Sequence, residues 1–341
     1  MSDRRLGVAV IGSGMIANTA HIPVWTVRTD SELLWVVDSR ADVARETAQR
    51  WGVAHWTTDY REALADGSVQ AVDICSSAFV HAEQTLAALG AGKHVLVEKP
   101  LATSVVDARS MEQAALASDR VVMVTENWVF ATATRRVKRL IDEGVLGDLF
   151  MIQASNENDF MLAQVSRPEV ADRDRLGYAF VGGIHTLAVA RHLMGEFDRI
   201  SAFANAKPDV AGLNVLYDTE MAISARFRSG AVGTFHLIGR APHPGRGLRS
   251  FRVFGTRGWA EFDVFSGLVS WTDGTATRTE TQYRSSAGHP ESIEHFVECI
   301  RGKKQPVTSV TDQMRSLEAV HAAYQSARQG ETVAFEYQEV G

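Results

Sequence analysis

The first forty residues contain a pattern whose chemistry is the binding of a dinucleotide. A short apolar run, Leu6 to Ile11, is typical of a buried parallel strand. It leads directly into the G-x-G-x-x-G/A fingerprint, here Gly12-Ser13-Gly14-Met15-Ile16-Ala17. The first glycine of this fingerprint allows a tight turn, the second lets the backbone approach a pyrophosphate, and the small last residue lets a helix pack on the strand.

A second apolar run, residues 33–37, ends in Asp38, about twenty residues beyond the glycines. A carboxylate at that point accepts hydrogen bonds from an adenosine ribose and repels a 2′-phosphate, which favours NAD. Arg40 could instead hold such a phosphate, so NADP remains an alternative. A glycine turn without a ligand is the simpler interpretation of the glycines alone. The order strand, turn, helix, strand and acid favours nucleotide binding, with contacts from residues 12–16 and from Asp38, Ser39 and Arg40.

The composition is that of a globular enzyme. The chain has 341 residues, which is enough for two domains, and 45% of them are apolar while 22% are charged. A net charge of −6 gives no reason to expect nucleic acid or an anionic membrane as partner, and no apolar stretch reaches the length of a membrane span. The two cysteines, Cys75 and Cys299, suggest a reducing compartment, so we expect a cytoplasmic protein.

Residues 1–125 alternate apolar strands with helices, which predicts a doubly wound parallel sheet of the Rossmann type. Ligands of such sheets bind beyond the carboxyl ends of the strands. Polar residues follow three of the predicted strand ends: Asp38, the segment 76–81, and Glu98-Lys99-Pro100.

Residues 126–341 read differently and are predicted to form a second domain for substrate binding and oligomerisation. Predicted strands at 149–154, 221–227, 231–238, 249–255, 258–264 and 268–272 are joined by hairpin-like turns. This pattern predicts an α+β domain with an open, mostly antiparallel sheet. Of the helices expected here, at 134–143, within 177–194, at 291–301 and at 311–329, a C-terminal one could pack back on the first domain.

Over nearly its whole length the chain resembles the Gfo/Idh/MocA oxidoreductases. The resemblance rests on the glycine fingerprint and on Gly92-Lys93-His94-Val95-Leu96-Val97-Glu98-Lys99-Pro100-Leu101, Gly182-Gly183-Ile184-His185 and Gly255-Thr256-Arg257-Gly258-Trp259. It implies a Rossmann domain followed by an open antiparallel sheet through which dimers or tetramers form. It also implies hydride transfer between a nicotinamide cofactor and a carbinol or ketone carbon of a sugar, polyol or sugar derivative.

The resemblance assigns a catalytic role to Lys99. Its ammonium group follows a predicted strand, and Pro100 restricts the backbone beside it. An ammonium there could hydrogen-bond the reacting oxygen and stabilise alkoxide charge. Further cofactor contacts implied by the resemblance are Ser76, His81, Glu98, Lys99, Pro100 and Asn127. The loop that carries Ser76 and His81 departs from the family's Thr-Pro-Asn-x-x-His, because it lacks the proline and the asparagine.

His185 is the second catalytic candidate, because an imidazole near the nicotinamide could exchange a proton with the carbinol while hydride leaves the carbon. A histidine that merely packs between domains is the alternative. The family usually has an aspartate four residues before this histidine, and this chain has Val181 there; the residue three positions after it is Ala188. The chain therefore looks like a divergent branch of the family. Tyr178 or a residue near Asn156 and Glu157 could replace the missing acid.

Substrate contacts are expected from Trp128, Asn156, Glu157, Tyr178 and His185, with the Trp128 ring stacking on a sugar. No metal site is expected, since His185 and His192 are seven residues apart with no carboxylate beside them. Two other functions stay open. One is an NAD-dependent glycosidase or lyase that oxidises transiently and eliminates the aglycone. The other is a regulator that binds the nucleotide and catalyses nothing.

Overall fold

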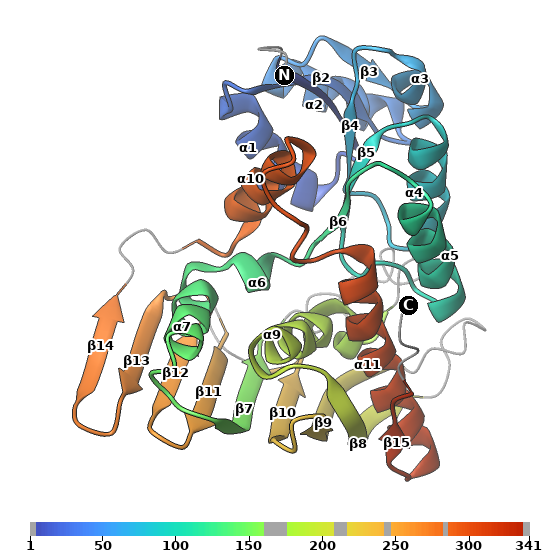
Figure 1. Cartoon of the computed structure of the whole chain (residues 1–341). Helices are drawn as coiled ribbons and strands as arrows, with labels where there is room; N and C mark the ends of the chain where they lie inside the picture. The colour runs from blue at the N-terminus through green and yellow to red at the C-terminus, as the bar shows by residue number, and fades with distance from the viewer. Residues whose placement is uncertain (1–4, 160–175, 208–216, 242–246, 282–285, 337–341) are drawn as a thin grey trace. The chain divides into compact units, whose positions relative to one another are not determined.

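The computed structural model of the chain describes residues 5–159, 176–207, 217–241, 247–281 and 286–336. The chain divides into two compact units, both of which are drawn in Figure 1. The first unit comprises residues 1–127 and 289–315, and the second comprises residues 128–288 and 316–341.

The first unit is built on a six-stranded parallel sheet with the strand order β3-β2-β1-β4-β5-β6. This is the order of a dinucleotide-binding Rossmann sheet. Its central strands are almost completely buried, as expected for a parallel sheet covered on both faces. The strands are β1 (Leu6–Ile11), β2 (Ser31–Val37), β3 (His55–Thr57), β4 (Ala71–Ile74), β5 (His94–Glu98) and β6 (Val122–Thr125).

Helices connect these strands. The Asp59 side chain accepts a hydrogen bond from the Arg61 backbone at the start of α3, and Ser104 caps α5 in the same way through Asp107. Gly52 ends α2 in the left-handed conformation that a glycine adopts without strain. The helical segments of this unit are the π-helical turn η1 (Ala17–His21), α1 (Ile22–Val27), α2 (Ala41–Trp51), α3 (Tyr60–Ala65), α4 (His81–Gly90), α5 (Val105–Leu116) and α10 (His289–Ile300).

The second unit is built on a nine-stranded sheet with the order β14-β13-β12-β11-β7-β10-β9-β8-β15. All neighbours in it are antiparallel except β7 and β10, which run parallel in the middle of the sheet. The strands are β7 (Leu149–Glu157), β8 (Phe197–Lys207), β9 (Tyr217–Phe227), β10 (Val232–Ile238), β11 (Arg249–Gly255), β12 (Trp259–Asp263), β13 (Leu268–Thr272), β14 (Thr277–Thr281) and β15 (Val333–Ala334).

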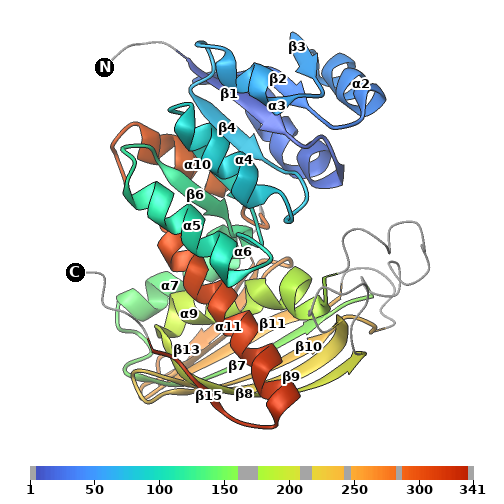
Figure 2. The ribbon, with the colours of Figure 1, turned by 90° about the vertical axis from the view of Figure 1, so that its right-hand side faces the viewer.

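Helices cover one face of this sheet, as Figure 2 shows for α7 and α9. Burial alternates along the strands accordingly. In β10, Phe235 and Leu237 are buried on the helical side, while Val232 and His236 are exposed on the other. The remaining helical segments of the chain are α6 (Asn127–Phe130), α7 (Thr132–Asp142), the π-helical turn η2 (Ala179–Gly183), α9 (Ile184–Met194) and α11 (Val310–Gln329). Among the described residues, no helix has both the length and the apolar character needed to cross a membrane.

The predicted fold class is confirmed: a parallel Rossmann-type sheet and a second, mostly antiparallel open sheet, each with helices. The strands β3, β8, β14 and β15 were not predicted. β3 and β15 are only three and two residues long, and β14 is a polar edge strand in which no side chain is buried. Such segments carry little hydrophobic pattern, because they pack against few apolar neighbours.

The turn between β11 and β12 depends on backbone contact at Gly258. A Cβ atom added there would lie 1.9 Å from the Thr272 carbonyl oxygen, which is backbone and cannot move aside. We predict that Gly258→Ala lowers the free energy of unfolding by about 1–3 kcal/mol in urea titrations. Gly90→Ala is the control, because nothing lies within 4 Å of a Cβ at that position. Equal stability of the two variants would show that this contact does not constrain the turn.

Candidate active site

The glycine turn has the geometry that its sequence predicts. Gly12 adopts a φ of 93°, and a Cβ there would lie 2.5 Å from the Ser76 backbone nitrogen, so only glycine fits. A Cβ at Gly14 would meet nothing within 4 Å. Gly14 is exposed, as is the next side chain, Met15. The turn therefore packs against the start of the Ser76 loop on one side and leaves open space at its second glycine, as a closely approaching phosphate requires.

Asp38 lies beside this turn. One of its carboxylate oxygens accepts a hydrogen bond from the Ser13 backbone at 3.0 Å, and the other accepts one from the Arg40 backbone at 3.0 Å. The Ser13 hydroxyl donates to the Val37 carbonyl, which closes the turn onto the end of β2. Ser39 and Arg40 are exposed, and Ile16 is half-buried. The predicted nucleotide residues from β1 to β2 are thus brought together around one carboxylate.

The loop after β4 is fixed to the end of β5 by His81. Its Nδ1 lies 3.0 Å from the Pro100 carbonyl oxygen, and its Nε2 lies 3.1 Å from the Ser76 carbonyl oxygen. Burial lowers the pKa of His81, so the neutral ring donates to one carbonyl at a time. The Ser76 hydroxyl donates to Gln84 at 2.6 Å. His81 therefore holds this loop in place from inside the unit, where it is 1% exposed.

Lys99 follows β5 directly. Its side chain is half-buried, and its peptide bond to the buried Pro100 is cis. Its backbone N–H donates to the carboxylate of the preceding residue, Glu98, at 3.2 Å. Asn127, which is 4% exposed, lies just past β6. The predicted residues at the ends of β4, β5 and β6 therefore belong to the same edge of the parallel sheet as Gly12 and Asp38.

A buried charge cluster at this edge was not predicted from the sequence. His21, at the end of η1, is fully buried; its Nδ1 lies 2.8 Å from Asp73 and its Nε2 lies 2.9 Å from Glu98. The Trp25 indole donates to the same Asp73 oxygen at 2.6 Å. The one signal in the sequence is Asp73 itself, a charged residue in the middle of the apolar strand Ala71–Ile74, since buried carboxylates usually have a partner.

The protonation of this cluster follows from its charges. Burial alone would lower the pKa of His21, but the charge and hydrogen bond of Asp73, together with Cys75, raise this pKa well above its ordinary value. Burial would raise the pKa of Glu98, but the hydrogen bond and charge of His21 hold it at about 2. His21 is therefore an imidazolium that donates from both ring nitrogens to carboxylates.

His21 also belongs to two groups of side chains that could bind a metal ion. The ligand atoms of His21, Glu98 and His289 lie within 4.8 Å of one another, as do those of His21, Asp73 and Cys75. Each ring nitrogen of His21 already donates to a carboxylate, so a metal ion would have to displace one of these protons. The absence of a metal site stays a prediction.

In the second unit, His185 packs against Trp128. The two rings stack with centroids 4.6 Å apart and planes 10° apart, and they are 7% and 5% exposed. The rings of Trp128 and Phe265 form a T-shaped pair, with their centroids 5.6 Å apart and their planes at 87°. One face of Trp128 is therefore covered by the imidazole, and the expected stacking of a sugar on this ring is restricted to what its other face allows.

Tyr178, Asn156 and Asn158 form a buried network beneath the segment that leads to His185. The Tyr178 hydroxyl donates to Asn156 at 2.8 Å and accepts from the Asn158 amide. The Asn156 amide donates to the Gly182 carbonyl at 2.9 Å and to the Thr186 hydroxyl at 3.2 Å. Tyr178 and Asn156 are each 1% exposed, and burial raises the pKa of Tyr178. They thus anchor the start of α9.

The other residues near His185 add little polar chemistry. Val181 is half-buried within η2, and Ala188 is buried in α9, so neither offers a proton. Glu157, at the end of β7, is half-buried and accepts a hydrogen bond from Ser155 at 2.5 Å. Of the side chains named as substitutes for the missing acid, Tyr178 and Asn156 are buried in the anchoring network, whereas Glu157 retains a half-buried carboxylate.

Asp218 is a second buried carboxylate that the sequence analysis did not single out. It is fully buried on β9 and accepts hydrogen bonds from the Tyr324 hydroxyl of α11 and from the Ala179 backbone at the start of η2. Burial raises its pKa to about 6, although both hydrogen bonds act in the opposite direction. Asp218 therefore joins β9, α11 and the π-helical turn that precedes His185.

Comparisons with known proteins agree with this architecture. Residues 6–126 match the oxidoreductase family model with an NAD-binding Rossmann fold, and residues 134–261 match the GFO/IDH/MocA C-terminal domain. The chain belongs to the Gfo/Idh/MocA oxidoreductase family.

Relatives of this Gfo/Idh/MocA protein are similar over much or nearly all of their length. The myo-inositol 2-dehydrogenase of Thermotoga maritima is 28% identical over 96% of this chain and 98% of its own length. The levoglucosan dehydrogenase of Pseudarthrobacter phenanthrenivorans is 27% identical over 76% of this chain and 74% of its own. A solved structure of levoglucosan dehydrogenase with NADH has the same fold, with a TM-score of 0.87 at 23% identity, over 97% of this chain and 99% of that one.

These matches confirm the predicted family, the predicted enzyme class and NAD as the cofactor. The nucleotide fingerprint of the first unit and the matched Rossmann model cover the same residues. The roles assigned to individual residues stay predictions, and the geometry above shows which of them lie together within each unit.

Asp218 gives the stability of this Gfo/Idh/MocA protein a specific pH dependence. Its pKa rises on folding from 3.8 to about 6, so between these values the folded state keeps a proton that the unfolded state releases. The free energy of unfolding therefore falls as the pH rises through this window. We predict that Asp218→Asn reduces this fall by up to about 3 kcal/mol, measured by urea titration at pH 4 and pH 7.

The exposed side chain of Glu46 on α2 provides the control, since Glu46→Gln removes a carboxylate that is not buried and should leave the wild-type difference between the two pH values in place. If Asp218→Asn and the wild-type protein lost the same stability between the two pH values, Asp218 would be ionised in the folded state and its burial would have no titration consequence.

Proposed function

We propose that this protein oxidises a CH–OH carbon of a sugar, polyol or sugar derivative with NAD, or reduces the corresponding ketone with NADH. The observation that carries the proposal is the carboxyl edge of the parallel sheet, where an open glycine turn follows β1, the Asp38 carboxylate follows β2 and Lys99 follows β5. The full-length similarity to myo-inositol 2-dehydrogenase, and the similarity to levoglucosan dehydrogenase, support a carbohydrate-like substrate.

The residues of the glycine turn would hold the pyrophosphate of NAD, and Asp38 would accept from the adenosine ribose. When bound, the nicotinamide supplies the hydride acceptor. Ser76, His81, Glu98, Pro100 and Asn127 would shape the adjoining part of the pocket, with His81 acting from the interior by holding the loop and Pro100 together. The carboxylate of Asp38 also supports a preference for NAD over NADP, because it repels a 2′-phosphate.

Lys99 would act on the substrate oxygen. A half-buried ammonium can donate a hydrogen bond to the substrate oxygen and stabilise the alkoxide as hydride leaves the carbon; the hydroxyl proton itself can be taken up only by the neutral amine form of the lysine or by another base. His185 would be the second proton-transfer group. The Trp128 stack and the Asn156 network fix its ring and its helix, a task that a carboxylate performs for many catalytic histidines.

The experiment that tests this function is a screen of sugars, polyols and glycosides with NAD and NADP. Absorbance of the reduced cofactor and release of aglycone are followed in the same wells. Formation of NADH from a free sugar or polyol is the expected result. Aglycone release without net NADH would instead identify a glycosidase or lyase, and binding of NAD without any turnover would identify a regulator.

Lys99 should matter more than His185, because the acid that usually accompanies the histidine is Val181 here. We predict that Lys99→Met lowers turnover by about 10²–10³, or about 2.7–4 kcal/mol, with little change in NAD affinity. His185→Ala should cost somewhat less, about 10². Steady-state kinetics and calorimetric NAD titration measure both effects. Near-normal turnover by Lys99→Met on a true substrate would refute the assignment.

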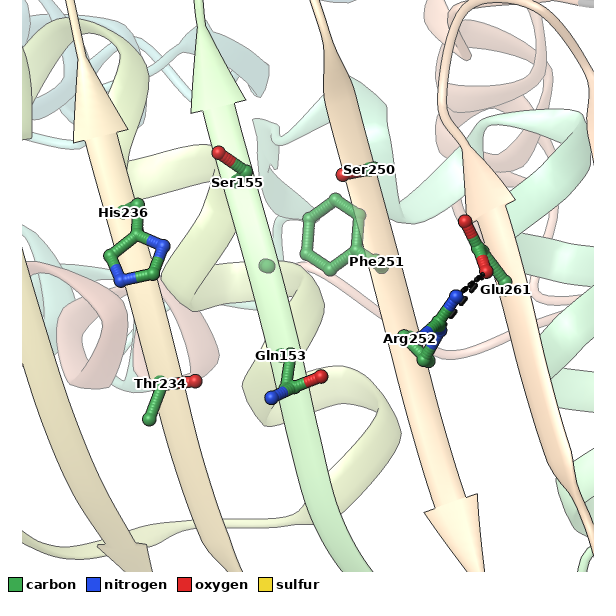
Figure 3. A pocket seen from close by; sticks show the side chains of 9 residues that line it. Gln153, Ser155, Thr234, His236, Ser250, Phe251, Arg252 and Glu261 are labelled. Carbon is green, nitrogen blue, oxygen red and sulfur yellow. Dashed lines mark hydrogen bonds and ion pairs between the residues drawn. The ribbon is translucent and has the colours of Figure 1, made fainter.

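We also propose that the protein is a homodimer or homotetramer formed through the face of the nine-stranded sheet that lies opposite α7 and α9. Figure 3 shows part of this face, a shallow pocket of about 250 Å³ between neighbouring strands. Its polar lining includes Gln153, Thr234, His236 and Arg252, and exposed apolar side chains such as Phe203 lie elsewhere on the sheet. A broad, partly apolar face of this kind is suited to self-association.

This assembly can be tested by light scattering. The wild-type protein should be a dimer or tetramer at micromolar concentration, and Thr234→Arg, a bulky charge in the middle of the sheet, should shift it towards monomer. Leu116→Arg, at an exposed position on α5 in the first unit, should not. A monomeric wild-type protein would rule out the proposal.

The two cysteines support the expectation of a cytoplasmic protein. Cys75 and Cys299 are both buried and neither forms a disulfide. Free thiols in a protein of this size are typical of a reducing compartment.

A further inference from the structure

The cluster around His21 has no role in the proposed reaction so far, although it lies immediately behind the proposed catalytic lysine. His21 and Asp73 are 0% exposed and Glu98 is 5% exposed, and His21 contacts both carboxylates. Three charges have been removed from water here, which costs free energy unless their contacts repay it. Because burying these charges costs free energy, we expect the cluster to have a structural or functional role.

The connection from His21 to Lys99 takes two steps. The Nε2–H of His21 donates to one oxygen of Glu98 at 2.9 Å. The other oxygen of the same carboxylate accepts from the backbone N–H of Lys99 at 3.2 Å. Each oxygen of the Glu98 carboxylate therefore accepts one hydrogen bond, one from His21 and one from the backbone of Lys99. The carboxylate links His21 to the backbone that carries the Lys99 side chain.

His21 is itself held firmly. Its Nδ1–H donates to Asp73, which also accepts from the Trp25 indole, and the edge of its ring faces His289 with the centroids 5.6 Å apart. The charged or titratable groups around it are Asp73 from β4, Cys75 just beyond β4, Glu98 from β5, Lys99 just beyond β5, and His289 from α10. The imidazolium also offsets the negative charge that Asp73 and Glu98 bring to the end of the sheet.

We propose that His21 is a positioning residue of the reaction: through Glu98 it fixes the backbone at Lys99 and so the place of the ammonium group. This inference rests on the proposed function, since it takes Lys99 as the group that contacts the reacting oxygen. A displacement of a catalytic group by about 1 Å can cost up to about 100-fold in rate, so a rigid support for Lys99 has a measurable effect.

Two substitutions of His21 separate this role from a merely structural one. The amide nitrogen of glutamine in His21→Gln occupies the place of Nε2 and can still donate to Glu98. The amide nitrogen of asparagine in His21→Asn occupies the place of Nδ1 and can donate only to Asp73. Both variants lose the positive charge. Asparagine is one methylene smaller than glutamine, so urea titration of both variants separates a general loss of stability from a loss of kcat.

The inference predicts that His21→Asn lowers kcat by about 10- to 100-fold while the calorimetric Kd for NAD changes by less than about threefold, and that His21→Gln recovers most of the lost kcat. Equal losses in both variants, or no loss in either, would overturn it. If His21→Asn does not fold, Glu98→Asp is measured instead. That variant keeps the charge but draws the carboxylate back by one methylene, and it should show the same loss of kcat; a normal kcat would overturn the inference.

Crystal structures of the two His21 variants give a result that does not depend on turnover. The Glu98 carboxylate and the Lys99 backbone should be displaced in His21→Asn and unmoved in His21→Gln. If the wild-type protein oxidises none of the tested substrates, the proposed function fails, and these structures alone decide whether His21 positions Lys99. An unmoved Glu98 in His21→Asn would overturn the inference even if the oxidation itself is confirmed.

Discussion

The arrangement of the first unit depends on one constraint: in a parallel sheet all carboxyl ends meet at the same edge. The register makes this explicit, because Ile11 on β1 pairs with Ile74 on β4, and Ile74 pairs with Val97 on β5. Gly12, Cys75 and Glu98 are therefore the next residues along three adjacent strands. Everything polar that follows these strands must share a small volume, and the backbone turn at Gly12 is shaped by the loop that begins at Ser76. Nucleotide binding and the proposed chemistry both use this enforced proximity.

Carboxylates buried in the fold cost free energy, and the two units stabilise their buried carboxylates in different ways. In the first unit, Asp73 and Glu98 are brought together by neighbouring strands, and His21 supplies a positive charge between them. In the second unit, Asp218 has no cation among its hydrogen-bonding partners, and burial instead moves its pKa upward to about 6 while Tyr324 and Ala179 donate to it. The first unit compensates its two carboxylates with a buried cation, and the second unit gives its buried carboxylate hydrogen-bond donors while burial raises its pKa. Both solutions fix a π-helical turn, η1 in one case and η2 in the other.

The sequence predicts those features that depend on a few consecutive residues, and it does not predict contacts between residues far apart in the chain. The apolar runs and glycines specify the central strands and the nucleotide turn, because each of these features is written within about ten consecutive residues. Asp38 is found because its distance from the glycines is set by one strand and one helix. The contact between His21 and Glu98 joins residues 77 positions apart, and no pattern of neighbouring residues predicts it. Trp128 shows the same limit. Its indole was expected to meet a sugar, but its partner 57 residues later, His185, is apparent only in the folded unit.

The burial of both thiols has a practical consequence for spectroscopy. Cys75 and Cys299 are 5% and 4% exposed, and burial raises the pKa of both, that of Cys299 to about 11. Maleimide reagents react with accessible thiolates, so the two native cysteines should react with them very little. A cysteine introduced at an exposed position, such as Val106 on α5 or Asp142 on α7, would then be the dominant labelling site without any prior removal of native cysteines. Fluorophores placed one in each unit would test whether the distance between the two labels changes when a nucleotide is added.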